Sequence, residues 1–443
     1  MKNKVSIILL VMLMAAILLS GCNPQTTTTA ATTAGSNGTT TTSSTTESVA
    51  TTTTSSGNAT GELKVWMPPF GTEDTLDKVF WEGKINEWAT PKGIKTTVEI
   101  TPWGNYEEKY LTGITSGQGP DVGYMYLEMI ADYINMEALV ALDEHLTAAD
   151  RDNYLYLANG VVQGKQYMLP IVVGNPRIFV CNMDILAKSG FTEVPKTWED
   201  LVTYGKKILV DSPEVAPFAQ GWAQPSVGAL NVLFYPYLWQ ADGSLVSDDN
   251  EWIFNSEAGI KAVTFAQSLM YDSKIMPENC TAYEDSDITN MFLEGKIAMT
   301  IVGASEAKQI EEAGINWDFV ASLTDVTGGT FVASDALVMI NTAKDPVLAF
   351  ECMRYMTSGP VMAAFHKELS PFPPIGKDEP YGDNPKFEEM YATSSSIFHS
   401  LPAVAGSSKV FDALYKNLQL VMLNEMSPKE ALDEAVKYAD SLD

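Results

Sequence analysis

Residues that could support catalysis occur in this chain of 443 residues, but they lack the spacing of catalytic motifs. The segment from Gly160 to Gln166 has the glycines and the lysine of a phosphate-binding loop, yet its spacing is one residue short and glutamine replaces the final Ser or Thr. No Gly-x-Ser-x-Gly motif is present, and His145, His366 and His399 are isolated, without zinc-protease spacing. Carboxylates are plentiful, so their number alone does not exclude a catalytic pair of the kind that glycosidases use. Most of them fall on polar helix faces, where a solvated charge is expected.

The cysteines predict neither a metal site nor a disulfide framework. Cys181, Cys280 and Cys352 show no metal-ligand spacing, and three cysteines cannot all pair, so one bridge at most is expected. The sequence gives no reason to expect a metal or another cofactor.

The fourth cysteine, Cys22, follows a secretory signal. Lys2 and Lys4 precede an apolar run from Val5 to Leu19, which is too short to span a bilayer comfortably. The run ends in Leu-Ser-Gly-Cys, which resembles the lipobox of bacterial lipoproteins, where the cysteine is diacylated and begins the mature chain. The resemblance implies a signal peptide over residues 1–21. It also implies a lipid anchor, such as palmitate, on Cys22 that holds the protein on the extracellular face of the cell membrane. The alternative is a plain signal peptide with an incidental cysteine.

The segment of residues 22–60 is almost entirely Thr, Ser, Ala, Gly and Asn. Because it offers almost no large apolar side chain for burial, nothing offsets the entropy cost of ordering it. We therefore predict a disordered tether, with the first folded residues near Glu62–Trp66.

Composition limits the partners and the architecture. The formal net charge of −28 argues against nucleic acid as a partner. A folded part from about Gly61 to Asp443 is long for a single hydrophobic core, so two lobes are expected.

The first half of the folded part alternates strands with helices. Apolar strands are predicted at Glu62–Met67, Lys95–Pro102 and Val122–Tyr126, with helical spacing between them, which indicates parallel pairing in an α/β sheet. Two further apolar runs, Tyr167–Val173 and Ile178–Cys181, are separated by Gly-Asn-Pro. We interpret them as a strand that leaves one lobe, bends, and enters the other; a buried strand with an ordinary turn is the alternative.

The second half is mainly helical. Thr197 with Asp200 forms a capping-box variant that opens a helix over Trp198–Val210, and an amphipathic helix is predicted over Glu257–Tyr271. Strands are expected at the end of Met291–Val302 and at Phe331–Ile340. A capping box at Ser427 opens the last helix, through Leu442.

Several segments together resemble the family 1 extracellular solute-binding proteins of ABC importers, which are similar to maltose-binding protein and bind sugars. They occur in the family's order over nearly all of the folded part: Trp103–Tyr110, Ser116–Val122, Gly164–Pro170, Asn182–Leu186, Pro195–Leu201, Phe292–Thr300, Asp345–Thr357 and Glu430–Asp433.

The resemblance implies an α/β, two-lobe, periplasmic-binding-protein-like fold with hinge crossovers and a ligand cleft between the lobes. It places crossovers near Pro170–Arg177, Ala298–Val302 and Ile340–Lys344. The expected N-lobe is then residues 61–173 plus 300–340, and the expected C-lobe is residues 174–299 plus 341–443.

The implied ligand is a sugar or oligosaccharide, delivered to an ABC permease by a monomeric, non-catalytic receptor. Aromatic rings suit the C–H faces of sugars, whereas Asp, Glu, Asn and Arg suit their hydroxyls. In this family such groups sit at strand ends and in cleft loops. The candidate contacts are Trp66, Phe70, Tyr126, Glu128, Asn175, Arg177, Trp222, Tyr235 and Trp239. For each aromatic, core packing is the competing role.

Two departures from the family pattern affect the ligand. Many relatives carry Asp-Gly-x-Trp where this chain has Val302-Gly-Ala-Ser305, so an aromatic platform is missing there. Cys181 stands where relatives often have Tyr. A surface-anchored extracellular glycosidase is the alternative function, and a peptide or metal receptor is a third.

Overall fold

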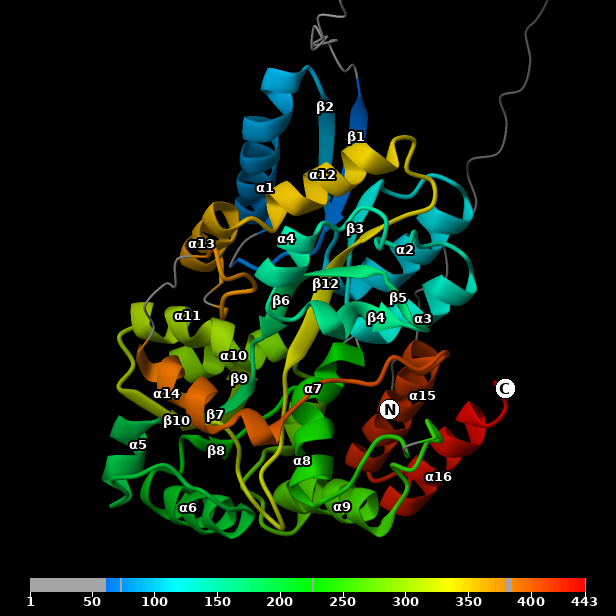
Figure 1. Ribbon diagram of the computed structural model, residues 1–443. Helices are drawn as coiled ribbons and strands as arrows, with labels where there is room; N and C mark the ends of the chain where they lie inside the picture. Colours follow the sequence, from blue (N-terminus) through cyan, green and yellow to red (C-terminus); the bar gives the residue numbers. More distant parts are fainter. Residues whose placement is uncertain are drawn as a thin grey trace, which may run out of the picture. The chain divides into compact units, whose positions relative to one another are not determined.

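The computed structural model describes residues 61–71, 74–224, 227–247, 249–370, 372–379 and 385–442 (Figure 1). The expected signal peptide, the anchor at Cys22 and the tether of residues 22–60 lie outside the described residues. Among the residues described, no helix is both long enough and apolar enough to cross a membrane.

The first lobe is built on a five-stranded sheet with the order β2-β1-β3-β12-β6. β1 (Glu62–Met67) pairs in parallel with β2 (Lys95–Ile100) and β3 (Val122–Met125), as the alternation of strands and helices predicts. β12 (Ala333–Met339) runs antiparallel to both β3 and β6 (Met168–Gly174).

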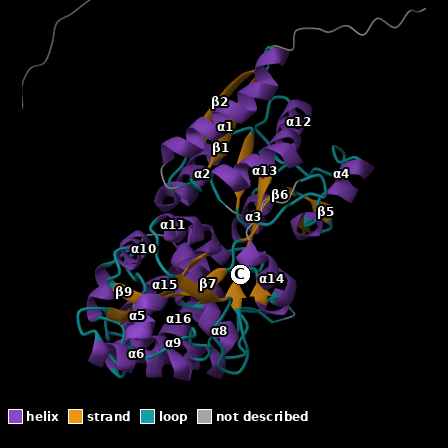
Figure 2. Ribbon diagram, turned by 90° about the vertical axis from the view of Figure 1, so that its left-hand side faces the viewer, coloured by secondary structure: helices purple, strands orange, loops and turns teal. Residues whose placement is uncertain are grey.

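Helices cover this sheet on the outside (Figure 2). They are α1 (Asp74–Ala89), α2 (Tyr106–Thr115), α3 (Leu127–Asn135), α4 (Ala148–Asn153), α12 (Pro346–Met356) and α13 (Gly359–Glu368). Their packing is strongly aromatic. Trp81 is fully buried against Phe80 and Phe365, with ring centroids 5.0 Å apart in the Phe80–Trp81 pair. Burial of such rings is a main source of the stability of this lobe.

The second lobe is built on a four-stranded sheet with the order β10-β7-β9-β8. Its strands are β7 (Arg177–Asn182), β8 (Ala216–Phe218), β9 (Ile297–Gly303) and β10 (Trp317–Val320). β9 is buried along its whole length because it lies between β7 and β8, and its seven residues are accordingly almost all apolar.

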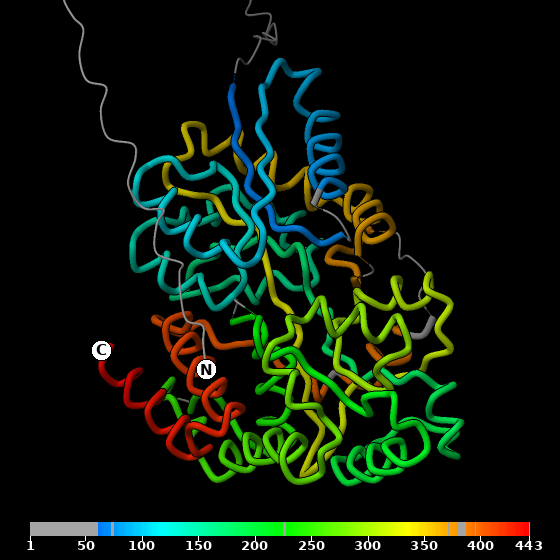
Figure 3. Tube along the Cα trace, turned by 180° about the vertical axis from the view of Figure 1, so that it is seen from behind, coloured from blue at the N-terminus to red at the C-terminus, as the bar shows by residue number. Residues whose placement is uncertain are grey.

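The helices of the second lobe surround this sheet, and the C-terminal pair lies beside α9 (Figure 3). They are α5 (Met183–Lys188), α6 (Trp198–Asp211), α7 (Leu230–Leu233), α8 (Tyr235–Gln240), α9 (Glu257–Tyr271), α10 (Asp285–Leu293), α11 (Ala307–Glu312), α14 (Pro385–Thr393), α15 (Ser407–Met422) and α16 (Pro428–Ala439). The capping box predicted for Thr197 and Asp200 is confirmed at the start of α6.

Short 3-10 turns link several of these elements: η1 (Thr90–Lys92), η2 (Trp103–Asn105), η3 (Leu157–Gly160), η4 (Val227–Ala229), η5 (Glu278–Ala282), η6 (Ala304–Glu306) and η7 (Ser395–Ile397). Two small sheets complete the described chain. β11 (Thr330–Phe331) pairs with β13 (Phe398–His399), and β4 (Val161–Val162) pairs with β5 (Lys165–Gln166). The Gly-rich segment rejected as a phosphate loop is thus a hairpin, with Gln163 and Gly164 at positive φ in its turn.

The chain crosses between the two sheets where the sequence predicts a bend. β6 lies in the first sheet and β7 in the second, so Gly174-Asn175-Pro176 forms the crossing. Gly174 has φ 94° and Asn175 has φ 47°. Both values lie in the left-handed region that favours Gly and tolerates Asn, which explains why these residue types stand at the bend.

The other two crossovers differ from the sequence-based expectation. Near Ala298–Val302 the chain does not change sheets, because β9 pairs with β7 and β8, and the return to the first sheet comes only between β10 and β12. Near Ile340–Lys344 the chain stays with the first lobe, where α12 packs against α1, β3 and β12. A strand's own composition shows that it is buried but not which sheet it joins.

The three cysteines of the described part are buried and unpaired: Cys181, Cys280 and Cys352. The single bridge that the sequence allowed is therefore absent from the described residues.

Candidate functional site

A cavity of about 330 Å³ is lined by residues of both lobes, a size typical of small-molecule sites. Its walls come largely from the ends of strands and from the turns that follow them. Phe70 follows β1, Tyr126 follows β3, and Gly303 ends β9. Residues just beyond the carboxyl ends of strands are free of ladder pairing, which is why α/β proteins place ligands there.

Aromatic side chains form much of the wall contributed by the first lobe. Phe70 makes edge-on contacts with Trp103 and Tyr124, with centroids 6.1 and 5.4 Å apart. The Trp103 indole N–H donates to the carbonyl of Pro69 at 3.0 Å, which orients the ring. Trp103 is 37% exposed and so offers a face to a bound molecule. Further rings in the lining are Tyr126, Phe331 and Phe372.

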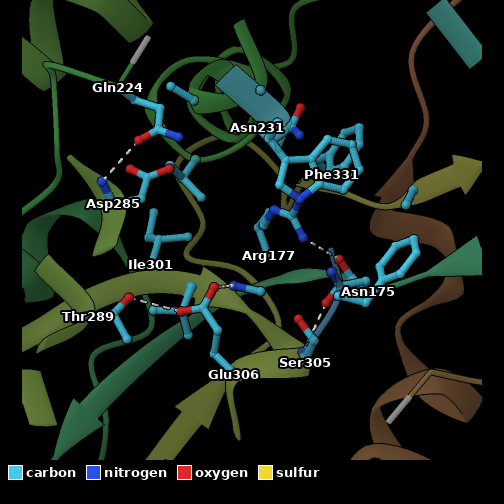
Figure 4. Close-up of a pocket in the computed structure, with 18 of the residues that line it drawn as sticks. Asn175, Arg177, Gln224, Asn231, Asp285, Thr289, Ile301, Ser305, Glu306 and Phe331 are labelled. Atoms are coloured by element: carbon cyan, nitrogen blue, oxygen red, sulfur yellow. Dashed lines mark hydrogen bonds between the residues drawn. The ribbon is translucent and has the colours of Figure 1, made fainter. Parts of the chain in front are cut away.

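Arg177 provides the cationic group of the site (Figure 4). Its Nη1 donates to the backbone carbonyl of Asn175 at 3.0 Å, and its guanidinium lies 5.2 Å from the ring centroid of Phe331. Burial lowers the pKa of Arg177, and the charges of Glu306, Asp335 and Asp285 oppose that effect. The guanidinium is therefore held by its hydrogen bond, by packing and by the more distant carboxylates, because no direct ion pair to it is found among the described residues.

Two carboxylates of the second lobe lie near this guanidinium. Glu306 accepts from the Thr289 hydroxyl at 3.1 Å and from the Gly303 N–H at 3.4 Å. Burial raises the pKa of Asp285 to about 7, helped by the charge of Glu306 and opposed by that of Arg177. Burial likewise raises the pKa of Glu306.

Two more carboxylates come from the first lobe. Asp335 of β12 accepts from the Tyr124 hydroxyl at 2.5 Å, yet burial raises its pKa to about 7. Burial raises the pKa of Glu128, in the first turn of α3, to about 8, and the charges of Asp335 and Glu107 act in the same direction. Carboxylates with raised pKa values in a recessed site are a common mark of function.

The crossing segment holds part of the cavity wall. The Asn175 side-chain oxygen accepts from the Ser305 N–H at 3.0 Å, and the Ala304 N–H donates to the carbonyl of Pro176 at 3.0 Å. These two hydrogen bonds join the turn after β9 to the segment that crosses between the sheets. This turn is where the sequence lacks the aromatic residue that many relatives carry. Gly303 and Ser305 line the cavity there, and Phe331 supplies a ring from a different strand.

The structure gathers five of the nine predicted contacts around this cavity: Phe70, Tyr126, Glu128, Asn175 and Arg177. The other four, Trp66, Trp222, Tyr235 and Trp239, are not among its lining residues. Trp66 packs against Tyr110 in the first core. Trp222 is 2% exposed and Tyr235 is 1% exposed. Trp239 stacks on His399 beside a second cavity of about 520 Å³ in the second lobe.

Sequence reasoning missed most of the other lining residues, among them Trp103, Asn231, Asp285, Glu306, Phe331 and Asp335. Only Trp103 carried a usable signal, because it begins one of the segments that resemble the family. Asp285 lies between the predicted helix Glu257–Tyr271 and the segment Met291–Val302, and Glu306 follows that segment. Nothing in the local sequence distinguished these two carboxylates from acidic residues on the surface.

Described residues include no group of His, Cys, Asp or Glu arranged to hold a metal ion. The cavity instead combines aromatic faces with hydrogen-bonding groups that point inward from several elements. Such an arrangement suits binding of a polar organic molecule through stacking and hydrogen bonds.

Comparison with known proteins agrees with this geometry. A family model for bacterial extracellular solute-binding proteins matches residues 84–389. The galactooligosaccharide-binding protein of Bacillus subtilis is 23% identical over 397 residues, which are 87% of this chain and 90% of that protein. A binding protein of Brucella abortus is 23% identical over 391 residues, 86% of this chain and 93% of that protein.

Among solved structures, an ABC transporter solute-binding protein from Thermotoga lettingae, bound with α-D-tagatose, superposes with a TM-score of 0.76. The two sequences are 22% identical, and the match covers 86% of this chain and 99% of that one. The likeness extends over both sheets and shows the two-lobe α/β fold.

Proposed function

Because this chain belongs to the bacterial extracellular solute-binding proteins, we propose that it binds a sugar or oligosaccharide between its two lobes and delivers it to the permease of an ABC importer. The observation that carries the proposal is the composition of the cavity. It combines the rings of Phe70, Trp103 and Tyr126 with the hydrogen-bonding groups of Asn175 and Arg177. Rings stack on the C–H faces of a sugar, whereas amide and guanidinium groups bind its hydroxyls. The relatives named above are described as binding a galactooligosaccharide and α-D-tagatose, which supports this ligand class.

We propose that the ligand draws the lobes together about Gly174-Asn175-Pro176, and that the permease recognises the liganded form. Sheet membership supports a division of the lobes that differs from the one expected from sequence. The N-lobe would comprise residues 61–174 and 333–370, and the C-lobe would comprise residues 177–331 and 385–442.

The anchoring and the oligomeric state are part of the same proposal. The N-terminal sequence supports diacylation of Cys22 and attachment to the outer face of the cell membrane, with residues 23–60 as a spacer. A monomer is proposed, because a receptor that closes around its ligand requires no second copy.

A screen of thermal stability over sugars and oligosaccharides tests the function. A bound ligand raises the melting temperature in proportion to the logarithm of its concentration. We expect at least one sugar to do so and to be recovered unchanged. Release of smaller sugars during incubation would instead favour the surface-anchored glycosidase, which none of the named relatives supports. If no sugar stabilises the chain, the proposed ligand class is wrong.

A further inference from the structure

Acidic side chains outnumber basic ones in the lining of the cavity. Those of the described residues are four carboxylates and one guanidinium: Glu128, Asp285, Glu306, Asp335 and Arg177. The charge of Arg177 favours ionisation of Asp285, Glu306 and Asp335. No lysine or arginine is paired with Glu128 among the described residues, and the charges that act on its pKa, those of Asp335 and Glu107, are both acidic.

The carboxyl group of Glu128 belongs to a residue that lines the cavity. It is the second residue of α3, 9% exposed, and part of the lining. Its own backbone N–H favours its ionised form, but no other hydrogen-bond donor to its carboxylate is found among the described residues. Tyr126 and Leu127 precede it in the sequence. The ring of Tyr126 lines the cavity, and the side chain of Leu127 packs against the core. A carboxylate that is recessed, without a cation and beside aromatic rings is an environment suited to an organic cation.

A second observation favours a ligand that donates hydrogen bonds. Asn231 of α7 is 9% exposed and lines the cavity, and its side-chain oxygen is buried with no hydrogen-bond partner (Figure 4). An unpaired buried acceptor costs free energy, so the occupant of the cavity is expected to donate to it.

A neutral sugar would satisfy only part of these groups. Its hydroxyls can donate to Asn231 and to carboxylates, but Glu128 and Asp335 must then keep their protons, because closure removes the water that would stabilise their ionised forms. A ligand with a protonated amine both donates hydrogen bonds and supplies the missing positive charge.

We propose that the ligand is an amino-substituted saccharide whose protonated amine binds against the carboxylate of Glu128. This inference rests on the proposed function, since it names the class of sugar for the same cavity. The Asn231 oxygen accepts from a further N–H or O–H of the ligand. The rings of Tyr126 and Trp103 contact its apolar faces.

Proton exchange gives the proposal a distinctive signature. Without ligand, Glu128 has a pKa of about 8 and Asp335 one of about 7, so at pH 7 Glu128 is mostly protonated and Asp335 is protonated about half of the time. A bound cation favours their ionised forms, and binding then releases protons. A neutral sugar that excludes water disfavours the ionised forms, and binding then takes protons up.

Calorimetric titration of the full chain with matched sugar pairs tests the inference. Glucose and glucosamine, galactose and galactosamine, and cellobiose and its di-amino counterpart differ within each pair only in hydroxyl against amine. Each pair is measured at pH 7 in phosphate and in HEPES, whose different heats of ionisation report the protons exchanged. We expect an amino member to bind at least tenfold more tightly than its hydroxyl partner, with release of protons.

The outcomes separate this inference from the proposed function. A neutral member that binds as tightly as its amino partner, or more so, overturns the inference and leaves the sugar-receptor function standing. If neutral sugars of the wider screen stabilise the protein and no amino sugar binds, the inference is also overturned, and the sugar-receptor function again stands. If no sugar of either kind binds, both proposals fail.

A variant identifies the carboxylate responsible. Glu128→Gln keeps the shape and removes the charge, so the preference for the amino member should fall at least tenfold and the proton release should decrease. Glu311→Gln, on the exposed surface of α11, is the matched control and should change neither. An unchanged preference in a folded Glu128→Gln variant would contradict the assignment of the amine to Glu128.

Discussion

Arg177 Nη1 donates to the backbone carbonyl of Asn175 at 3.0 Å, so the only guanidinium that lines the cavity among the described residues is bonded to the segment that connects the two sheets. The same asparagine accepts from the Ser305 N–H through its side chain. A rotation of the backbone at this crossing would therefore move a charged group of the site and the turn after β9 together. Under the proposed function, this linkage would couple ligand contact to movement of the lobes.

Arg177→Ala should weaken binding of the ligand by roughly 1.5–3 kcal/mol, the cost of losing a hydrogen bond to a charged group. Arg177→Lys should recover only part of the loss, because an ammonium lacks the planar fork of a guanidinium. Titration calorimetry with the sugar found in the stability screen measures both. Arg151→Ala removes an exposed arginine that faces Asp143 and should leave the affinity unchanged. Wild-type affinity in Arg177→Ala would exclude it from ligand binding.

Trp222 and Trp103 should respond to truncation in opposite ways. Trp222 is 2% exposed and lies outside the cavity lining, so Trp222→Ala should lower the free energy of unfolding by roughly 3–5 kcal/mol and change affinity little. Trp103 is 37% exposed within the lining, so Trp103→Ala should lower affinity by about 1–3 kcal/mol with a smaller loss of stability. Chemical denaturation and calorimetry on both variants separate the two effects. A Trp222→Ala variant of normal stability but poor affinity would restore Trp222 as a ligand contact.

Without ligand, the chain should become less stable as the pH rises from about 4.5 to about 8. Glu128 has its ordinary pKa near 4.5 when unfolded and a pKa of about 8 when folded, so the folded state binds more protons between these values. The unfolding free energy therefore falls as pH rises through this window, by roughly 1.4 kcal/mol for each pH unit per group at most. Asp285 and Asp335, each with a folded-state pKa of about 7, add to the slope.

Denaturant titrations at several pH values measure this slope, and Glu128→Gln should flatten it. At pH 8 the variant should be more stable than the wild type. An identical slope in both proteins would show that Glu128 ionises normally.

Gly174→Ala should destabilise the chain more than Gly164→Ala. Both glycines have positive φ, 94° and 76°, so each substitution incurs a backbone cost of roughly 1–2 kcal/mol. A Cβ at residue 174 would also lie 2.8 Å from Cγ of Pro373, whereas nothing lies within 4 Å of one at residue 164. Thermal unfolding of the two variants isolates the effect of the contact. Equal losses of stability in the two variants would show that the segment around Gly174 adjusts to the added methyl group without further cost.

Cys22→Ala should release the protein into the medium or leave it unprocessed, because the acyl chains would have no attachment site. Fractionation of cells that produce the variant measures this outcome, and Cys280→Ala, which alters a buried cysteine of the folded part, serves as the control. A variant that is processed and membrane-bound like the wild type would contradict the lipoprotein proposal.

Most of the fold could be predicted because it depends on local sequence patterns, namely the spacing of apolar residues and the positions of Gly and Pro. The alternation of apolar strands with helices predicted the parallel pairing of β1, β2 and β3, and Gly174-Asn175-Pro176 marked the crossing between sheets. The sheet membership of β9 could not be predicted, because an almost entirely apolar strand suits the interior of either sheet.

The site was harder to predict than the fold. Phe70, Tyr126 and Glu128 could be proposed because they lie shortly after the ends of β1 and β3, and such positions meet at one edge of a sheet. Trp222 and Tyr235 were proposed for their aromatic character, but the same character suits the core, where both are buried. Asp285 and Glu306 reach the cavity from helical turns of the second lobe, and this placement depends on tertiary packing alone.

The order in which the chain visits the two sheets has a consequence for how the protein is made. β12 enters the first sheet between β3 and β6, more than a hundred residues after either of them has been synthesised. The first sheet therefore cannot close until β7, β8, β9 and β10 have emerged. Neither lobe is a continuous stretch of chain that could be excised and refolded by itself. Loop closure over such separations slows folding and exposes unpaired strand edges meanwhile. A protein with this connectivity gains from being kept unfolded until its whole length has crossed the membrane.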